Sequence, residues 1–95
     1  MIEKYESRRL RVQIRHVFLD VWDPIGIKDE PNAQDEYDGY IGEVFELLVG
    51  KAPDESIEDY LLWAVNDHMG LSAPRSAMKE TVAALRKIEV PADSN

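Results

Sequence analysis

The hydrophobic positions of this chain recur at helical spacing in four stretches, of which the first covers residues 3–22. A second, narrower stripe lies nearly opposite the main one, and it consists of Tyr5, Val12 and Leu19. A helix with two apolar stripes is either central in a bundle or uses one stripe for a partner chain. We favour the central position. The main stripe comprises Leu10, Ile14, Val17, Phe18 and Val21.

Residues 35–49, 55–69 and 73–89 are predicted to form three further helices. Ser72 is the expected N-cap of the last helix, and His68 is expected to be a hydrogen-bonded core histidine. Short connections favour antiparallel neighbours, so the predicted fold is an all-α, up-and-down bundle of about four helices. The three buried faces are expected to comprise Tyr37, Ile41, Val44 and Leu48; Ile57, Tyr60, Leu61, Ala64, Val65 and His68; and Met78, Val82 and Leu85.

The first helix is expected to end at residues 23–27, because Pro24 disfavours helical geometry at the residue before it and cannot extend the hydrogen-bond ladder. Ile25 and Ile27 are expected to fold back beneath Trp22, whose role is assigned to stability. The 95 residues are enough for one domain, predicted over residues 1–90, with a flexible tail at 91–95.

Charge is distributed unevenly within a net charge of -8. Residues 1–16 carry five basic and two acidic side chains, whereas residues 17–68 carry two basic and fourteen acidic ones. Such an acidic field repels nucleic acid and anionic membranes and attracts basic proteins. The sequence therefore predicts a basic protein partner, no nucleic acid and no membrane. The alternative is that the acidic residues only keep the protein soluble.

The third predicted helix carries a candidate docking ridge. Asp59, Trp63 and Asp67 are four residues apart, so a regular helix would align them, with Leu62 as a neighbouring apolar anchor. An indole between two carboxylates suits a basic surface, because it offers cation–π contact beside acceptors for arginine. The alternative is that Trp63 packs against a neighbouring helix.

A second candidate cluster, Asp35, Glu36 and Asp38, alternates with tyrosines at the start of the second predicted helix. These acids could extend the same docking face or complement the positive end of the helix dipole, and we favour the second interpretation. They could also associate weakly with magnesium or calcium, although the spacing does not match a calcium loop. We expect no cofactor and no metal site.

Catalytic signatures are absent from the sequence. The chain has no cysteine, no glycine-rich phosphate loop and no Gly-x-Ser-x-Gly motif, and the first residues lack the apolar core of a secretory signal. No apolar stretch is long enough for a membrane span. These features favour a non-enzymatic, soluble, cytoplasmic protein.

The order of three motifs is also informative: Trp22-Asp23-Pro24-Ile25-Gly26, then Asp29-Glu30-Pro31, then Asp35-Glu36-Tyr37-Asp38-Gly39-Tyr40-Ile41. With Met69-Gly70-Leu71 after an acidic helix, this order resembles a group of small bacterial all-helical proteins of unassigned function, over residues 17–71. The resemblance implies an all-helical fold and a bacterial origin, and it supplies no activity.

In size, acidity and lack of a catalytic motif the chain is also similar in style to bacterial toxin-immunity proteins. Three hypotheses follow. The first is an acidic module of the immunity or inhibitor kind that neutralises a basic partner. The second is a self-associating structural protein whose dimer seam is the Tyr5–Val12–Leu19 stripe. A monomer and a homodimer both remain open, and a small metal binder or enzyme is the third hypothesis.

Overall fold

The computed structural model describes residues 3–90, and the expected tail at 91–95 lies outside them. The prediction of an all-α bundle of about four helices is confirmed, with no strand among the residues described. The helices are α1 (Lys4–Val17), α2 (Ile41–Val49), α3 (Asp54–Trp63) and α4 (Arg75–Arg86). Two π-helical turns extend α1 and α3, namely η1 (Phe18–Trp22) and η4 (Ala64–His68), and two 3₁₀ turns, η2 (Pro31–Ala33) and η3 (Asp38–Tyr40), precede α2.

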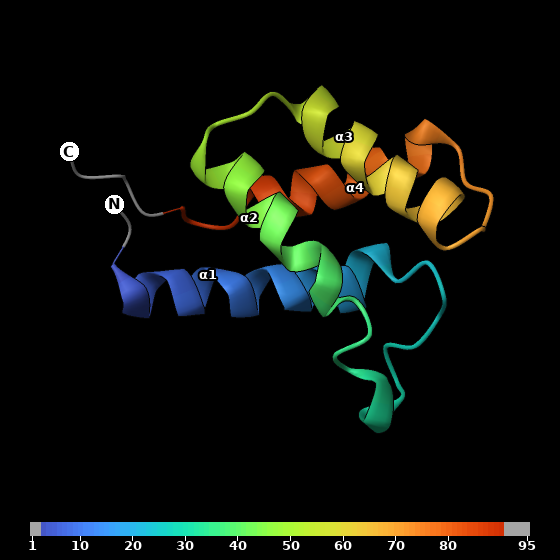
Figure 1. The fold of residues 1–95 in the computed structure, drawn as a ribbon, viewed down its shortest axis with the longest axis horizontal. Coiled ribbons are helices and arrows are strands. Elements are labelled where there is room, and N and C mark those ends of the chain that lie inside the picture. Colours follow the sequence, from blue (N-terminus) through green and yellow to red (C-terminus); the bar gives the residue numbers. More distant parts are fainter. Residues whose placement is uncertain (1–2, 91–95) are drawn as a thin grey trace.

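Helix α1 runs along one side of the molecule, and α2 crosses between it and the antiparallel pair of α3 and α4 (Figure 1). The helices bury one continuous core, which explains why the apolar periodicity found all four of them, although not all of their ends. Its largest fully buried side chains are Tyr37, Phe18, Leu10, Ile14, Ile57, Leu61 and Leu85.

Two arginines of α4 clamp this helix to α3. Near the start of α4, Arg75 contacts the carboxylates of Glu58, at 3.0 Å, and Asp59. Near its end, Arg86 Nε donates to Asp54 at 2.7 Å. Glu58 is buried, and Lys79 also lies 3.7 Å from it, so its charge is compensated from two sides.

The position of α1 differs from the predicted central one. Its second stripe is divided, because Leu19 is buried whereas Tyr5 is 66% and Val12 46% exposed. Nothing in the described part of the chain covers the outer face of α1, so this helix is lateral in the bundle (Figure 1). Val21 is exposed rather than buried, because the π-turn at η1 changes the helical register before it.

Other boundaries were also predicted incorrectly. The second helix begins at Ile41 instead of residue 35, because the chain is held by turns until the end of η3. Pro74, and not Ser72, occupies the N-cap of α4, and no side chain caps it. Ile25 is exposed, so only Ile27 of the expected pair packs against the core.

Trp22 is buried among three other aromatic side chains, which agrees with the role in stability that we predicted for it. Its side chain is 7% exposed, and its ring centroid lies 4.8 Å from Phe18, 5.4 Å from Tyr37 and 5.6 Å from Tyr40. The indole Nε1 is buried, with no hydrogen-bond partner among the residues described. The side chain therefore acts through packing and not through its N–H group.

We predict that Trp22→Ala lowers the free energy of unfolding by about 3–5 kcal/mol, because it leaves a large cavity beside three aromatic rings. Trp22→Phe should cost less than Trp22→Ala, since it retains a ring and removes an unpaired N–H. Urea unfolding measures both, with the exposed Val12→Ala as the matched control. A Trp22→Ala variant as stable as this control would contradict the prediction.

Candidate functional site

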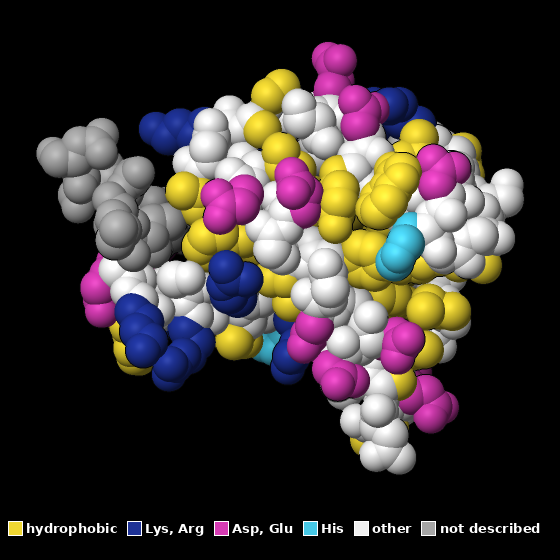
Figure 2. All heavy atoms as spheres, in the orientation of Figure 1, with side chains coloured by type: hydrophobic (Ala, Val, Ile, Leu, Met, Phe, Trp, Pro, Cys, Tyr) yellow, Lys and Arg dark blue, Asp and Glu magenta, His cyan; other side chains and the backbone are white. Residues whose placement is uncertain are grey.

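Four ring side chains from three elements meet at the surface. They are Tyr40 of η3, Tyr60 and Trp63 of α3, and His68 of η4, and we call them the aromatic platform. The indole of Trp63 is stacked with the rings of Tyr60, at 5.8 Å, and His68, at 5.3 Å. Trp63 nevertheless remains 46% exposed. Figure 2 shows a histidine beside a hydrophobic patch, with acidic side chains around it.

The π-turn η4 explains why His68 lies beside Trp63. An α-helix turns about 100° per residue, which places residue i+5 about 140° around the axis from residue i. In η4 the N–H of Met69 instead donates to the carbonyl of Ala64, five residues earlier, at 2.8 Å. This wider turn brings residues i and i+5 to the same side of the helix, and Trp63 and His68 have that spacing.

His68 was predicted to lie in the core, and this prediction is wrong. Its side chain is exposed, because the π-turn rotates it out of the register in which Leu61, Ala64 and Val65 are buried. Its Nδ1 lies 2.6 Å from the hydroxyl of Tyr40, within hydrogen-bond distance. The histidine thus belongs to the candidate site and not to the interior.

Tyr40 connects the platform to the core. Its ring lies 5.5 Å from His68 and 6.4 Å from Tyr60 on one side, and 5.6 Å from the buried Trp22 on the other. Burial, followed by the negative charge of Glu36, raises the pKa of the Tyr40 hydroxyl above 10.0. The hydroxyl therefore stays protonated at neutral pH and remains available as a hydrogen-bond donor.

Acidic side chains lie on the same face as the histidine and its hydrophobic patch (Figure 2). Burial raises the pKa of Tyr60, and the negative charge of Glu43 adds to this rise, as the charge of Glu36 does for Tyr40. Asp67 is exposed on η4, in the residue before His68. We call Glu36, Glu43 and Asp67 the acidic rim. Glu36 and Asp67 were predicted as site residues from the sequence, whereas Glu43 was not, although its position three residues after Tyr40 is visible there.

The remaining predicted site residues have other surroundings. Asp59 is exposed but paired with Arg75, and Asp38 accepts two hydrogen bonds from Arg15, one of them at 2.9 Å. Leu62 is half-buried against the core. Asp35 is exposed next to Glu36. The predicted ridge continues regularly only as far as Trp63, because the α-helical register ends there.

The segment leading to Tyr40 is held by a hydrogen-bonded pair. Tyr37 is fully buried, its hydroxyl donates to Asp23 Oδ1 at 2.9 Å, and it accepts from the N–H of Ile25 at 2.9 Å. Asp23 also accepts from the N–H of Ile27 at 2.7 Å. Its φ of 29° is one that aspartate tolerates better than most residues. The pair thereby fixes the turn between α1 and η3.

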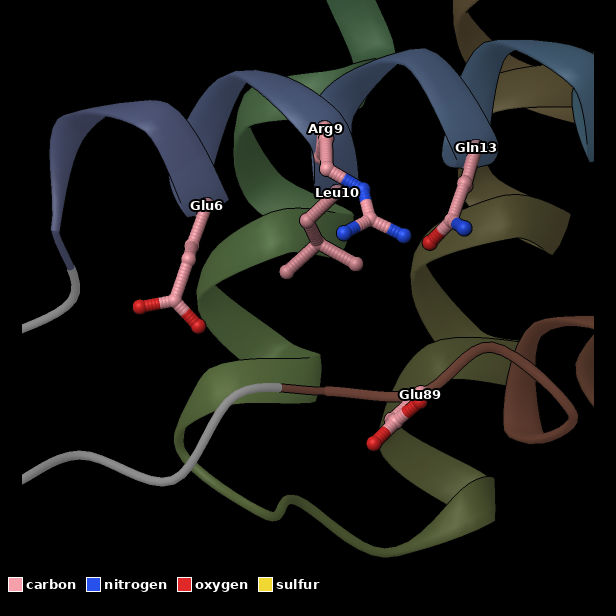
Figure 3. A pocket seen from close by; sticks show the side chains of 5 residues that line it. All are labelled: Glu6, Arg9, Leu10, Gln13 and Glu89. Atoms are coloured by element: carbon pink, nitrogen blue, oxygen red, sulfur yellow. The ribbon is translucent and has the colours of Figure 1, made fainter.

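A hollow of about 160 Å³ lies elsewhere, between α1 and the segment after α4. Figure 3 shows Glu6, Arg9, Leu10 and Gln13 of α1 on one side of it and Glu89 on the other. Its volume is below the ~300–1,000 Å³ typical of small-molecule sites. In the described residues no group of three or more histidine, cysteine or acidic side chains is placed to hold a metal ion.

Comparisons with known protein families, curated proteins and solved structures found no match to this chain. No helix in residues 3–90 has both the length and the apolar content needed to cross a bilayer.

We predict that Asp23 contributes a pH-dependent part of the stability. Burial acts to raise its pKa, but hydrogen bonds from Ile27, Tyr37 and Lys28 outweigh burial and bring the pKa below 3.8. A carboxylate whose pKa is lower in the folded state contributes fully above pH 3.8, and the contribution is lost as the pH falls through the folded-state pKa.

Asp23→Asn should therefore lower the free energy of unfolding by about 1–3 kcal/mol near neutral pH and flatten its decline in acid. Urea unfolding at about pH 7 and about pH 3 measures both effects. Asp29→Asn, which removes an exposed carboxylate in the same loop, is the matched control. Equal acid sensitivity of wild type and Asp23→Asn would exclude this role for Asp23.

Proposed function

We propose that this chain is a non-enzymatic, acidic protein-binding module that docks a basic partner on the aromatic platform and acidic rim. The observation that carries the proposal is the surface exposure of Trp63 while its ring is stacked with Tyr60 and His68. A stacked indole loses little conformational freedom on binding, and tryptophan is enriched among residues that dominate interface energetics.

The charges support a basic partner. Residues 17–68 hold fourteen carboxylates and two lysines, and the rim members Glu36, Glu43 and Asp67 are exposed. An arginine guanidinium could stack on the indole while a rim carboxylate accepts its N–H groups. Long-range attraction between the acidic surface and a basic protein would accelerate encounter, and the apolar contact at Trp63 would slow dissociation.

The roles of the candidate residues divide accordingly. Trp63 is the anchor, and Leu62 supports it from its half-buried position. Asp67, Glu36 and Asp35 supply negative charge that forms no ion pair with a cation of residues 3–90. Asp59 and Asp38 contribute to the field while their own partners, Arg75 and Arg15, hold them in place. A module of this kind would act as an immunity or inhibitor protein by covering a basic surface of its target.

A hexa-arginine peptide, used as a probe in calorimetry at low salt, tests the proposal. Trp63→Ala, and separately Glu36→Lys with Asp67→Lys, should each weaken binding about tenfold, because one removes the anchor and the other reverses the rim. The charge control is Glu80→Lys with Glu89→Lys, which makes the same change in net charge away from the platform. Asp59 and Asp38 are left unchanged because they hold ion pairs.

Equal weakening by the rim and control variants would mean that net charge alone attracts the peptide. In that case, or if Trp63→Ala binds as well as wild type, the platform is not the docking site. Thermal unfolding of each variant verifies that the loss of binding is not a loss of folding.

A further inference from the structure

The outer face of α1 is a second surface of interest, because no helix of residues 3–90 packs against it. It carries Tyr5, Arg8, Arg9 and Val12, which we call the α1 stripe. Tyr5 and Val12 are 66% and 46% exposed, and both arginines are exposed. The four residues, with Gln13, line one shallow hollow of about 290 Å³. Exposed apolar side chains between arginines have the composition of a protein interface.

Arg8 and Arg9 also differ from the other four arginines. Arg15, Arg75 and Arg86 each contact a carboxylate of the bundle, and Arg11 lies 4.4 Å above the ring of Phe45. Within residues 3–90, no carboxylate lies within ion-pair distance of Arg8 or Arg9. Among the described residues, Arg8 and Arg9 therefore form no ion pair, although Arg9 lines the hollow that Glu6 and Glu89 also line.

The α1 stripe cannot pair favourably with the α1 stripe of a second copy. Antiparallel helices that matched Tyr5 with Val12 would place Arg8 opposite Arg9 twice, and four guanidinium groups would repel one another. Leu19, which was expected to complete a dimer seam, is buried. The stripe thus requires an acidic counterpart.

The chain itself presents such a counterpart on the same side. Figure 2 shows basic side chains over the N-terminal half of α1, and acidic side chains farther along the same face. A second hollow runs from the stripe toward the start of α2, and it is lined by Arg8, Arg11, Val12, Arg15, Asp38 and Ile41. Its one carboxylate, Asp38, is paired with Arg15, so the negative charge open to a partner lies beyond it, on the acidic rim. When opposite charges lie side by side on one face, a two-fold rotation brings each over its complement.

We propose that two copies of this chain form a closed dimer, in which the α1 stripe of each docks on the aromatic platform and acidic rim of the other. The inference rests on the proposed function, because it uses the same platform and names the α1 stripe as a basic ligand for it. The 14 residues of α1 span about 21 Å, so the contacts are small and the dimer is of the weak, exchanging class.

The net charge of -8 opposes dimerisation at long range without preventing it at contact. At physiological ionic strength charges are screened beyond about 8 Å, whereas ion pairs in contact are affected much less. The dimer should therefore be sought at physiological salt and high protein concentration, and a basic partner that occupies the platform should dissociate it.

Sedimentation velocity of the full chain, from about 10 μM to about 1 mM, tests the dimer. The wild-type mass should rise toward twice the monomer value across this range. Arg8→Glu with Arg9→Glu should remain monomeric, and so should Glu36→Arg with Glu43→Arg. Lys51→Glu with Lys87→Glu makes the same charge change at exposed positions off the stripe and should still dimerise.

An equimolar mixture of the two monomeric variants gives the decisive result. Each variant has the charge of one of the two surfaces reversed. In a mixed pair the acidic stripe of one variant therefore meets the basic rim of the other, and the unchanged stripe meets the unchanged rim. Both contacts are attractive, so a heterodimer should appear. A wild-type chain that stays monomeric at the highest concentration, or a mixture that does not pair, would overturn the dimer. Hexa-arginine binding separates the two proposals: if the wild-type monomer still binds the peptide at the platform, only the dimer is lost, and if neither occurs, both are.

Discussion

The position of Tyr40 is the constraint on which the rest of the structure depends. Its ring touches the buried Trp22 on one side and the surface rings of Tyr60 and His68 on the other. Two separate structural features bring Tyr40 and His68 together. The Asp23–Tyr37 pair fixes the loop that delivers Tyr40, and the π-turn η4 rotates His68 toward it. The core and the candidate site are therefore held by one continuous set of aromatic contacts.

These aromatic contacts explain how the exposed indole of Trp63 is held in one conformation. An isolated surface tryptophan would sample several rotamers, and binding would restrict them at a cost in entropy. Trp63 instead stacks with two rings, and Tyr40, which packs against both, is itself fixed to the core. A preorganised apolar surface with carboxylates at its edge is suited to recognition of a cation, because little must be ordered when the partner arrives.

The helical content and most of the core could be predicted from the sequence. A helix that buries one face has hydrophobic residues every three to four positions, and this spacing is visible in the sequence. Leu10, Ile14, Ile41, Leu61 and Val82 were all placed correctly on this basis. The period fails where the helix changes type. At η1 and η4 the turn widens, so Val21 and His68 emerge at the surface although the regular period assigned them to the interior.

The candidate site was accessible to sequence reasoning only in part. Trp63 and the local carboxylates are visible as spacing within one helix, but the contact between Tyr40 and His68 joins residues 28 positions apart. Such a contact depends on the loop geometry at Asp23, which has a positive φ, and on a π-turn, and neither leaves a periodic signal. The ion pairs that occupy Asp59 and Asp38 are likewise long-range consequences of packing.

The most direct test of the central claim is a residue-resolved NMR titration of the wild-type chain with a basic probe such as hexa-arginine. If the aromatic platform is the docking surface, the largest shifts will occur at the Trp63 indole N–H, the His68 ring and the amides around Tyr40 and Tyr60. Shifts distributed over all exposed acidic residues, with the Trp63 indole unaffected, would contradict it.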